Sequence, residues 1–295
     1  MQSGRIIKGV GGLYTVATAN GLYMCTARGI FRKRKITPSI GDFVDIDAVV
    51  ENEKEATAII THIHARRNTL LRPAVVNVDQ AVLVFAVVRP APNMDLLDRF
   101  ILATANRDVE PLLCFNKLDL LGKNDAEAFE GTRRIYEDAG YAVCLVSAET
   151  GEGLDVLRQA LRDKVSVLAG PSGAGKSSLI NAILPGANLE TGALSRKIQR
   201  GKHTTRHSEL FEVSPNSFIV DSPGFTTIAT DELNRDNLPL LFREFAPYTG
   251  QCRYADCKHL REPHCAVKAQ VGLTIAPVRY KRYETLMNEV PQEVY

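Results

Sequence analysis

The sequence predicts three domains of different classes: an N-terminal β-barrel, a central α/β domain built on a mostly parallel sheet, and a small, mostly α, metal-binding domain. Three observations predict this division. β-forming runs broken by glycine fill residues 1–67, strands alternate with helices over residues 68–232, and cysteine and histidine cluster within residues 233–295. A chain of 295 residues, 45% hydrophobic and 24% charged, is long enough for two or three globular domains.

The first domain contains the β-like runs "GLYTVAT", "GLYMCTA", "DFVDIDAVV" and "ATAIITHIH". Five short strands in this length would suit an OB-type barrel, and the periodicity alone does not distinguish it from an SH3-like barrel. The stretch "RGIFRKRK" (28–35) places five cations around one aromatic side chain. It is either a solvated loop or a contact to the RNA backbone.

The second domain begins after the basic linker "RRNTLLRP" and alternates buried strands with helices. We expect strands within 79–88, 111–119, 142–147 and 165–170. Helices are expected at 95–107, near 125–139 and near 153–163. This rhythm is typical of a mostly parallel sheet with helices on both faces.

The stretch "GPSGAGKS" fits the phosphate-loop pattern G-x-x-x-x-G-K-[ST] between an apolar strand and a helix. Its glycines would let backbone N–H groups wrap a phosphate. Lys176 would reach the β- and γ-phosphates, and Ser177 would ligate Mg²⁺. The residues expected to contact the phosphates are Gly170, Pro171, Ser172, Gly173, Ala174, Gly175, Lys176, Ser177 and Ser178.

The stretch "NKLD" ends a predicted buried strand, where ligands bind in sheets of this class. The Asp119 carboxylate could accept the N1–H and the exocyclic amine of guanine, both of which adenine lacks. Asn116 would bind the opposite edge of the base, and the Lys117 stem would pack on its face. The predicted nucleotide is therefore GTP, with GDP as its hydrolysis product. An ATP-using kinase is the alternative, and Asp119 argues against it.

Three further stretches complete the predicted nucleotide site. "SAETGEG" supplies Ser147 and Ala148, whose backbone N–H could donate to guanine O6. "DSPGF" supplies Asp221, which would hold Mg²⁺ through water, and Gly224, whose N–H would sense the γ-phosphate. "GKHTTR" supplies a threonine for the Mg²⁺ shell, with the alternative that it is a plain polar loop. The first choice of threonine is Thr205 and the second is Thr204.

These motifs run in the order base, base, phosphate, switch, switch, which is a cyclic rotation of the usual GTPase order. A closed sheet-and-helix domain tolerates such a rotation because its termini lie at the surface, often close together. The central domain is thus predicted to be a circularly permuted P-loop GTPase sheet. The chain beyond Gly224 leads directly into the third domain, so we expect that domain to be the output of the switch.

The third domain contains the pattern C-x₄-C-x-H-x₅-C, formed by Cys252, Cys257, His259 and Cys265. Three thiolates and an imidazole are typical of a closed structural zinc site, with His264 as the second choice of histidine ligand. Free core cysteines are the alternative reading.

The C-terminal helix then carries three residues at helical spacing that we expect in the core, Tyr280, Tyr283 and Met287. Its cations could meet RNA phosphates; they are Arg279, Lys281 and Arg282.

The barrel, the rotated motifs and the cysteine–histidine pattern together resemble the bacterial ribosome small-subunit-dependent GTPase A family, also called RsgA, YjeQ or YloQ. The resemblance implies an N-terminal OB-fold, a permuted GTPase and a C-terminal domain with one structural Zn²⁺. It also implies a cytoplasmic GTP hydrolase that binds the small (30S) ribosomal subunit with its 16S rRNA late in maturation. Hydrolysis would be stimulated by that subunit. The alternative function is a GTP-licensed rRNA-binding assembly module in which hydrolysis is incidental.

The catalytic group is inferred from the two switch stretches. Phe225 occupies the place where Ras-like enzymes carry a water-orienting glutamine. The family pattern G-x-H-T-T implies His203 instead, and the alternative is that His203 binds rRNA or packs locally.

Composition bears on location and partners. The first residues contain no apolar signal region, and the longest apolar run, "AVLVFAVV", is too short to span a bilayer. The cysteines do not form a disulfide framework, so we expect a cytoplasmic protein with no membrane partner. The net charge of +2 means that any nucleic-acid contact must come from local patches. We expect a monomer.

Overall fold

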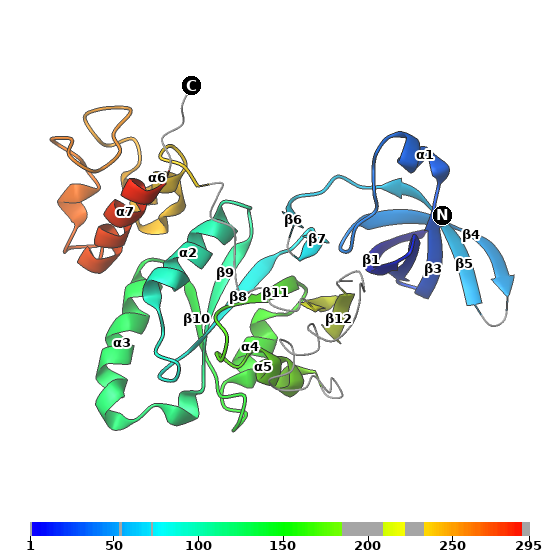
Figure 1. Cartoon of the computed structure of the whole chain (residues 1–295), viewed down its shortest axis with the longest axis horizontal. Coiled ribbons are helices and arrows are strands. Elements are labelled where there is room, and N and C mark those ends of the chain that lie inside the picture. Colours follow the sequence, from blue (N-terminus) through cyan, green and yellow to red (C-terminus); the bar gives the residue numbers. More distant parts are fainter. Residues whose placement is uncertain (1, 53–54, 72, 185–208, 222–232, 291–295) are drawn as a thin grey trace.

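The computed structural model describes residues 2–52, 55–71, 73–184, 209–221 and 233–290. It contains a β-barrel at one end, a helix-covered sheet in the middle and a small helical region at the other end (Figure 1). None of the helices in these described ranges is long and apolar enough to cross a membrane.

The barrel has the five strands that the sequence predicts: β1 (Gln2–Val10), β2 (Leu13–Thr18), β3 (Gly21–Ala27), β4 (Phe43–Asn52) and β5 (Glu55–Ile63). Neighbouring strands follow the order β1-β2-β3-β5-β4, and pairing of β4 with β1 closes the barrel. Inward-facing residues fill it, among them Ile6, Val16, Cys25, Val44 and Ile60. The stretch "RGIFRKRK" contains a short helix, α1 (Gly29–Lys33), anchored by the buried side chain of Phe31.

A small hairpin follows the barrel, made of β6 (Thr69–Leu71) and β7 (Ala74–Val76). The Val76 N–H donates to the Ile40 carbonyl at 2.9 Å, which joins the hairpin to the barrel. The hairpin is not predicted from sequence, because each strand has only three residues and β6 lies in the stretch interpreted as a basic linker.

The central sheet contains β8 (Gln80–Ala86), β9 (Glu110–Asn116), β10 (Ala142–Leu145), β11 (Val165–Ala169), β12 (Glu209–Ser214) and β13 (Ser217–Asp221). Its order is β10-β9-β8-β11-β13-β12, and only the edge strand β12 runs antiparallel to its neighbour. Every residue of β8 and β11 is buried. Such continuously apolar strands are expected when helices cover both faces of a parallel sheet.

Two pairs of helices provide this cover. One face packs against α2 (Met94–Ala105) and α3 (Lys123–Asp138), and the other packs against α4 (Leu154–Ala160) and α5 (Lys176–Ile183). Alternate residues of β8 divide between the two cores: Leu83 faces the first pair of helices and Val84 the second. A one-turn 3₁₀ helix, η1 (Leu118–Leu120), follows β9.

The barrel and the central sheet are continuous. Lys8 of β1 lies opposite Glu209 of β12, and their side chains form an ion pair at 2.9 Å. The Arg5 guanidinium lies 4.1 Å from the ring centroid of Phe43 in the barrel and 5.9 Å from that of Phe218 in β13. The barrel thus covers β12, whose backbone N–H and C=O groups would otherwise be unpaired at the edge of the sheet.

The C-terminal region contains α6 (Leu238–Leu241), η3 (Arg243–Tyr248), η4 (Lys268–Gln270) and α7 (Pro277–Glu289), and has its own core. Tyr280, Tyr283 and Met287 are buried in it, as their helical spacing predicts. The expectation for Arg279 is wrong, because this side chain is fully buried between carboxylates and cannot reach rRNA. Lys281 is exposed.

Candidate functional site

The phosphate loop lies between the end of β11 and the start of α5, at the carboxyl edge of the parallel strands. Three of its residues have positive φ: Gly170 (143°), Gly173 (79°) and Gly175 (92°). A Cβ on Gly170 would lie 2.1 Å from the Val84 carbonyl oxygen. The loop therefore needs glycine both for its conformation and for its close approach to β8.

Lys176 is the first residue of α5, and its side chain turns back into the loop. Its Nζ donates to the carbonyl oxygens of Gly170 at 2.6 Å and Pro171 at 2.8 Å. Burial lowers the pKa of Lys176, because the charged form is poorly hydrated there. Ser177 and Ser178 lie half-buried on the same first turn. The Lys176 ammonium is thus held within the glycine-rich loop, where it could bind a phosphate.

Asn116 joins three loops at the end of β9. Its Nδ2 donates to the Ala174 carbonyl in the phosphate loop at 3.0 Å, and its Oδ1 accepts the Ala148 N–H at 3.1 Å. A Cβ on Gly175 would lie 2.3 Å from this Nδ2. The buried amide thus fixes the two base-reading stretches against the phosphate loop. The Ala148 N–H, which the sequence assigns to guanine O6, has Asn116 as its partner in this structure.

Lys117 has a left-handed backbone, with φ of 66°. Its Nζ donates to the carbonyl oxygens of Gly173 at 2.6 Å and Arg89 at 2.8 Å. The contact with Arg89 brings a further segment, between β8 and α2, to the site. Sequence reasoning missed this segment; its only local signal is the proline-rich "RPAPN" after a buried strand.

Asp119 is exposed at the same edge, where the Ser147 hydroxyl donates to its Oδ1 at 2.5 Å. This hydrogen bond orients the carboxylate and leaves it open to solvent. The structure therefore brings the predicted base-reading residues and the phosphate loop to one place.

The switch residues are different. His203, Thr204, Thr205 and Gly224 lie outside the described residues, and Asp221 is the last residue of β13. Their places in the site stay predictions from sequence.

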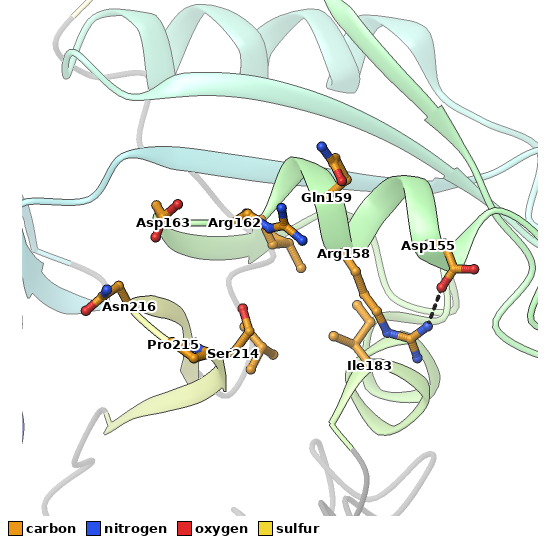
Figure 2. Close-up of a pocket in the computed structure, with 11 residues that line it drawn as sticks. Asp155, Arg158, Gln159, Arg162, Asp163, Ile183, Ser214, Pro215 and Asn216 are labelled. Carbon is orange, nitrogen blue, oxygen red and sulfur yellow. Dashed lines mark hydrogen bonds and ion pairs between the residues drawn. The ribbon is translucent and has the colours of Figure 1, made fainter.

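A pocket of about 600 Å³ lies elsewhere on the central domain, between α4 and the β12–β13 hairpin (Figure 2). Arg158 and Asp155 form an ion pair at 2.9 Å on its wall. None of the predicted nucleotide-binding residues lines it. We therefore do not assign the nucleotide to this pocket, although its volume is large enough for a small ligand.

The C-terminal cluster brings one ligand atom from each of Cys252, Cys257, His259 and Cys265 within 4.8 Å of one another. The His259 Nδ1 lies 3.4–3.6 Å from the three sulfurs, and two of the sulfurs are 3.8 Å apart. A tetrahedral zinc ion with Zn–S bonds of about 2.3 Å separates its sulfurs by about 3.8 Å. The residues present therefore fit zinc, and His264 is not part of the cluster.

Comparisons with known proteins decide the family. Residues 63–231 match the model of the RsgA GTPase domain, and residues 3–58 match that of the RsgA N-terminal domain. The chain belongs to the RsgA GTPase family.

RsgA relatives match along the whole chain. The small ribosomal subunit biogenesis GTPase RsgA of Alkaliphilus metalliredigens (strain QYMF) is 42% identical over 291 residues, covering 98% of each chain. That of Clostridium perfringens (strain SM101 / Type A) is 43% identical over 290 residues, with the same coverage.

Two solved structures share the fold. YloQ, described as a circularly permuted GTPase, superposes with a TM-score of 0.84 at 35% identity, over 98% of this chain and 95% of YloQ. YjeQ from Thermotoga maritima has a TM-score of 0.85 at 31% identity, over 98% of each chain. The predicted family, the fold class with its circular permutation, and the enzyme class of GTPase are confirmed.

Proposed function

We propose that this RsgA-family GTPase binds the small ribosomal subunit, acts in its late maturation, and hydrolyses GTP to GDP with stimulation by the subunit. The observation that carries the proposal is the meeting of the phosphate loop with both base-reading stretches around Asn116. The relatives named for small-subunit biogenesis support the choice of partner. A factor with that partner acts in the cytoplasm, and we propose that it does so as a monomer.

We propose the following division of labour in the nucleotide site. Asp119 reads the guanine base, with Asn116, Lys117, Ser147 and Ala148 around it. The backbone of residues 170–178 and the Lys176 ammonium hold the phosphates, and Asp221 and Gly224 complete that end. Mg²⁺, held by Ser177 and Thr205 with Thr204 as the alternative, would neutralise charge on the phosphates. His203 would orient the attacking water.

The proposed domains are the barrel of residues 1–67, the GTPase domain of 68–232 and the zinc domain of 233–295. Cys252, Cys257, His259 and Cys265 would hold one structural Zn²⁺. All four ligands come from the protein, which leaves no open coordination position for catalysis. The zinc would therefore stabilise the fold of the C-terminal region.

The proposal is tested by sedimentation with isolated small and large subunits, in the presence of GDP or a non-hydrolysable GTP analogue. We expect binding to small subunits that depends on the GTP analogue. Equal binding to both subunits, or none, would contradict the proposal. His203→Ala separates it from the alternative of incidental hydrolysis: with GTP, the variant should stay bound to small subunits if hydrolysis drives release, and should behave as the wild type otherwise.

A further inference from the structure

Arg279 of α7 is a fully buried arginine at the junction of the C-terminal region with the GTPase domain. Its Nε donates to Glu244 Oε1 at 2.7 Å and its Nη2 to Glu244 Oε2 at 3.3 Å. Its Nη1 donates to Asp98 of α2. Both carboxylates are buried as well. A buried charge is tolerated only when it is paired, so these contacts require the two parts to dock in one way.

Asp98 is the centre of this junction, because it also accepts from two other side chains. Arg282, about one turn along α7, donates to Asp98 Oδ2 at 2.8 Å, and the Tyr136 hydroxyl of α3 donates to Asp98 Oδ1 at 2.9 Å. Two arginines therefore face the buried carboxylates of Asp98 and Glu244, and Arg282 also pairs with the exposed Asp95 at 2.8 Å. Removing one arginine would leave a carboxylate buried without its full compensation, which is strongly unfavourable.

The same helix leads to the nucleotide site. Asp98 lies in the second turn of α2, which begins at Met94 with its N-terminus capped by Asn93. The segment just before it supplies the Arg89 carbonyl that accepts from Lys117 at 2.8 Å. The next residue, Pro90, lies against the phosphate loop: its Cδ is 3.6 Å from where a Cβ on Gly173 would be. A shift of α2 would therefore move Arg89, which holds the Lys117 side chain, and Pro90, which lies against the phosphate loop.

We propose that Arg279 is a positioning residue for the guanine-nucleotide site, acting through Asp98, α2 and the segment before α2 on Lys117. The inference rests on the proposed function, because it assumes that this site holds the nucleotide. Under this proposal, the C-terminal region influences nucleotide affinity through Lys117, in the stretch that reads the guanine base. That role is separate from the expected link through the chain after Gly224.

The test is the rate at which a fluorescent GDP analogue (mant-GDP) leaves the full-length, zinc-loaded protein. Arg279→Met should release it about tenfold faster, since couplings between sites typically change affinity by about 5- to 150-fold. Arg279→Lys, which keeps the charge without the forked donors, should lie between the variant and the wild type. Arg134→Met is the matched control, because Arg134 lies on α3 with its side chain 70% exposed, and it should release at the wild-type rate.

Zinc content and thermal unfolding identify the folded variants. If Arg279→Met fails to fold, Glu244→Gln is used in its place. The Glu244→Gln variant keeps Arg279 paired with Asp98 and should still release mant-GDP several-fold faster than the wild type. Combining Arg279→Met or Glu244→Gln with Pro90→Ala should accelerate release by less than the product of the two single effects, since both act on one relay.

The outcomes separate the two proposals. A folded Arg279→Met or Glu244→Gln variant with wild-type release, or effects that multiply fully with Pro90→Ala, would overturn the positioning role. A wild-type protein that binds no mant-GDP would overturn the nucleotide site itself.

Discussion

Asn116 shows how one buried side chain assembles the candidate site. Its amide donates to the phosphate loop and accepts from the stretch after β10, so it uses both ends of the side chain. The phosphate loop approaches it so closely that Gly175 has no room for a Cβ. The base-reading and phosphate-binding stretches are therefore one unit, although they lie 58 residues apart at this contact.

Asp119→Asn tests base recognition at the same scale. The amide cannot accept both guanine donors, and its own N–H group would face one of them, so GTP should bind about a hundredfold more weakly or worse. A xanthine nucleotide carries a carbonyl where guanine has its exocyclic amine, so it should bind this variant better than GTP does. Competition of both nucleotides against mant-GDP measures this. Unchanged preference for GTP would mean that Asp119 does not read the base.

Lys176→Met should make the nucleotide-free protein more stable and abolish GTP binding. Burial lowers the pKa of Lys176, so below that lowered value the native state bears the full cost of the buried charge. That cost falls as pH rises toward the ordinary value of 10.5 and vanishes above it. The nucleotide-free variant should therefore unfold at higher urea concentration than the wild type at pH 7.5, with a smaller difference at pH 9.5. It should bind no GTP. A less stable variant at pH 7.5 would contradict this account.

Residue roles were predictable from sequence where a local pattern carries them. The phosphate loop and the base-reading stretch are short, and each has a fixed spacing. Arg279 was not predictable: the sequence around it alternates cations with tyrosines, and its partner Asp98 is 181 residues away. Only the tertiary structure makes that pair.

At the scale of elements, the C-terminal region would be stabilised by a zinc ion held in its cysteine–histidine cluster. The elements there other than α7 are one or two turns long, and helices of that length are not stable by themselves. The proposed zinc ligands come from the irregular chain between η3 and η4. Binding of zinc would thus contribute directly to the folding of this region.

Removing zinc should unfold the C-terminal region. A strong chelator, or Cys252→Ser, should lower the first thermal transition and abolish the one zinc per chain measured by atomic absorption. Cys25→Ala is the control, since Cys25 lies in the barrel core and should leave the zinc content unchanged. A protein that melts identically with and without chelator would show that the cluster is not a structural zinc site.

Elements were predictable where their periodicity was strong. The buried strands and amphipathic helices of the central domain lie within a few residues of their predicted positions. The β6–β7 hairpin was not predictable, because its two strands have three residues each and the first of them lies in a basic stretch. Its position depends on the barrel, through the Ile40 carbonyl.

At the scale of the whole molecule, the GTPase sheet is held from both ends. The barrel pairs β1 with β12 at one edge, and the C-terminal region docks on α2 and α3 at the other side (Figure 1). No sequence pattern predicts the pairing of Lys8 with Glu209, because an edge strand can accept many partners. The arrangement places the barrel and the C-terminal region on opposite sides of the central sheet (Figure 1).

The most direct measurement is GTP hydrolysis by the purified protein with and without isolated small ribosomal subunits, with large subunits as the control. We expect slow turnover that small subunits alone stimulate strongly. Lys176→Met should show no activity in any condition. Turnover that small subunits do not change, or that large subunits stimulate equally, would contradict a GTPase gated by the small subunit.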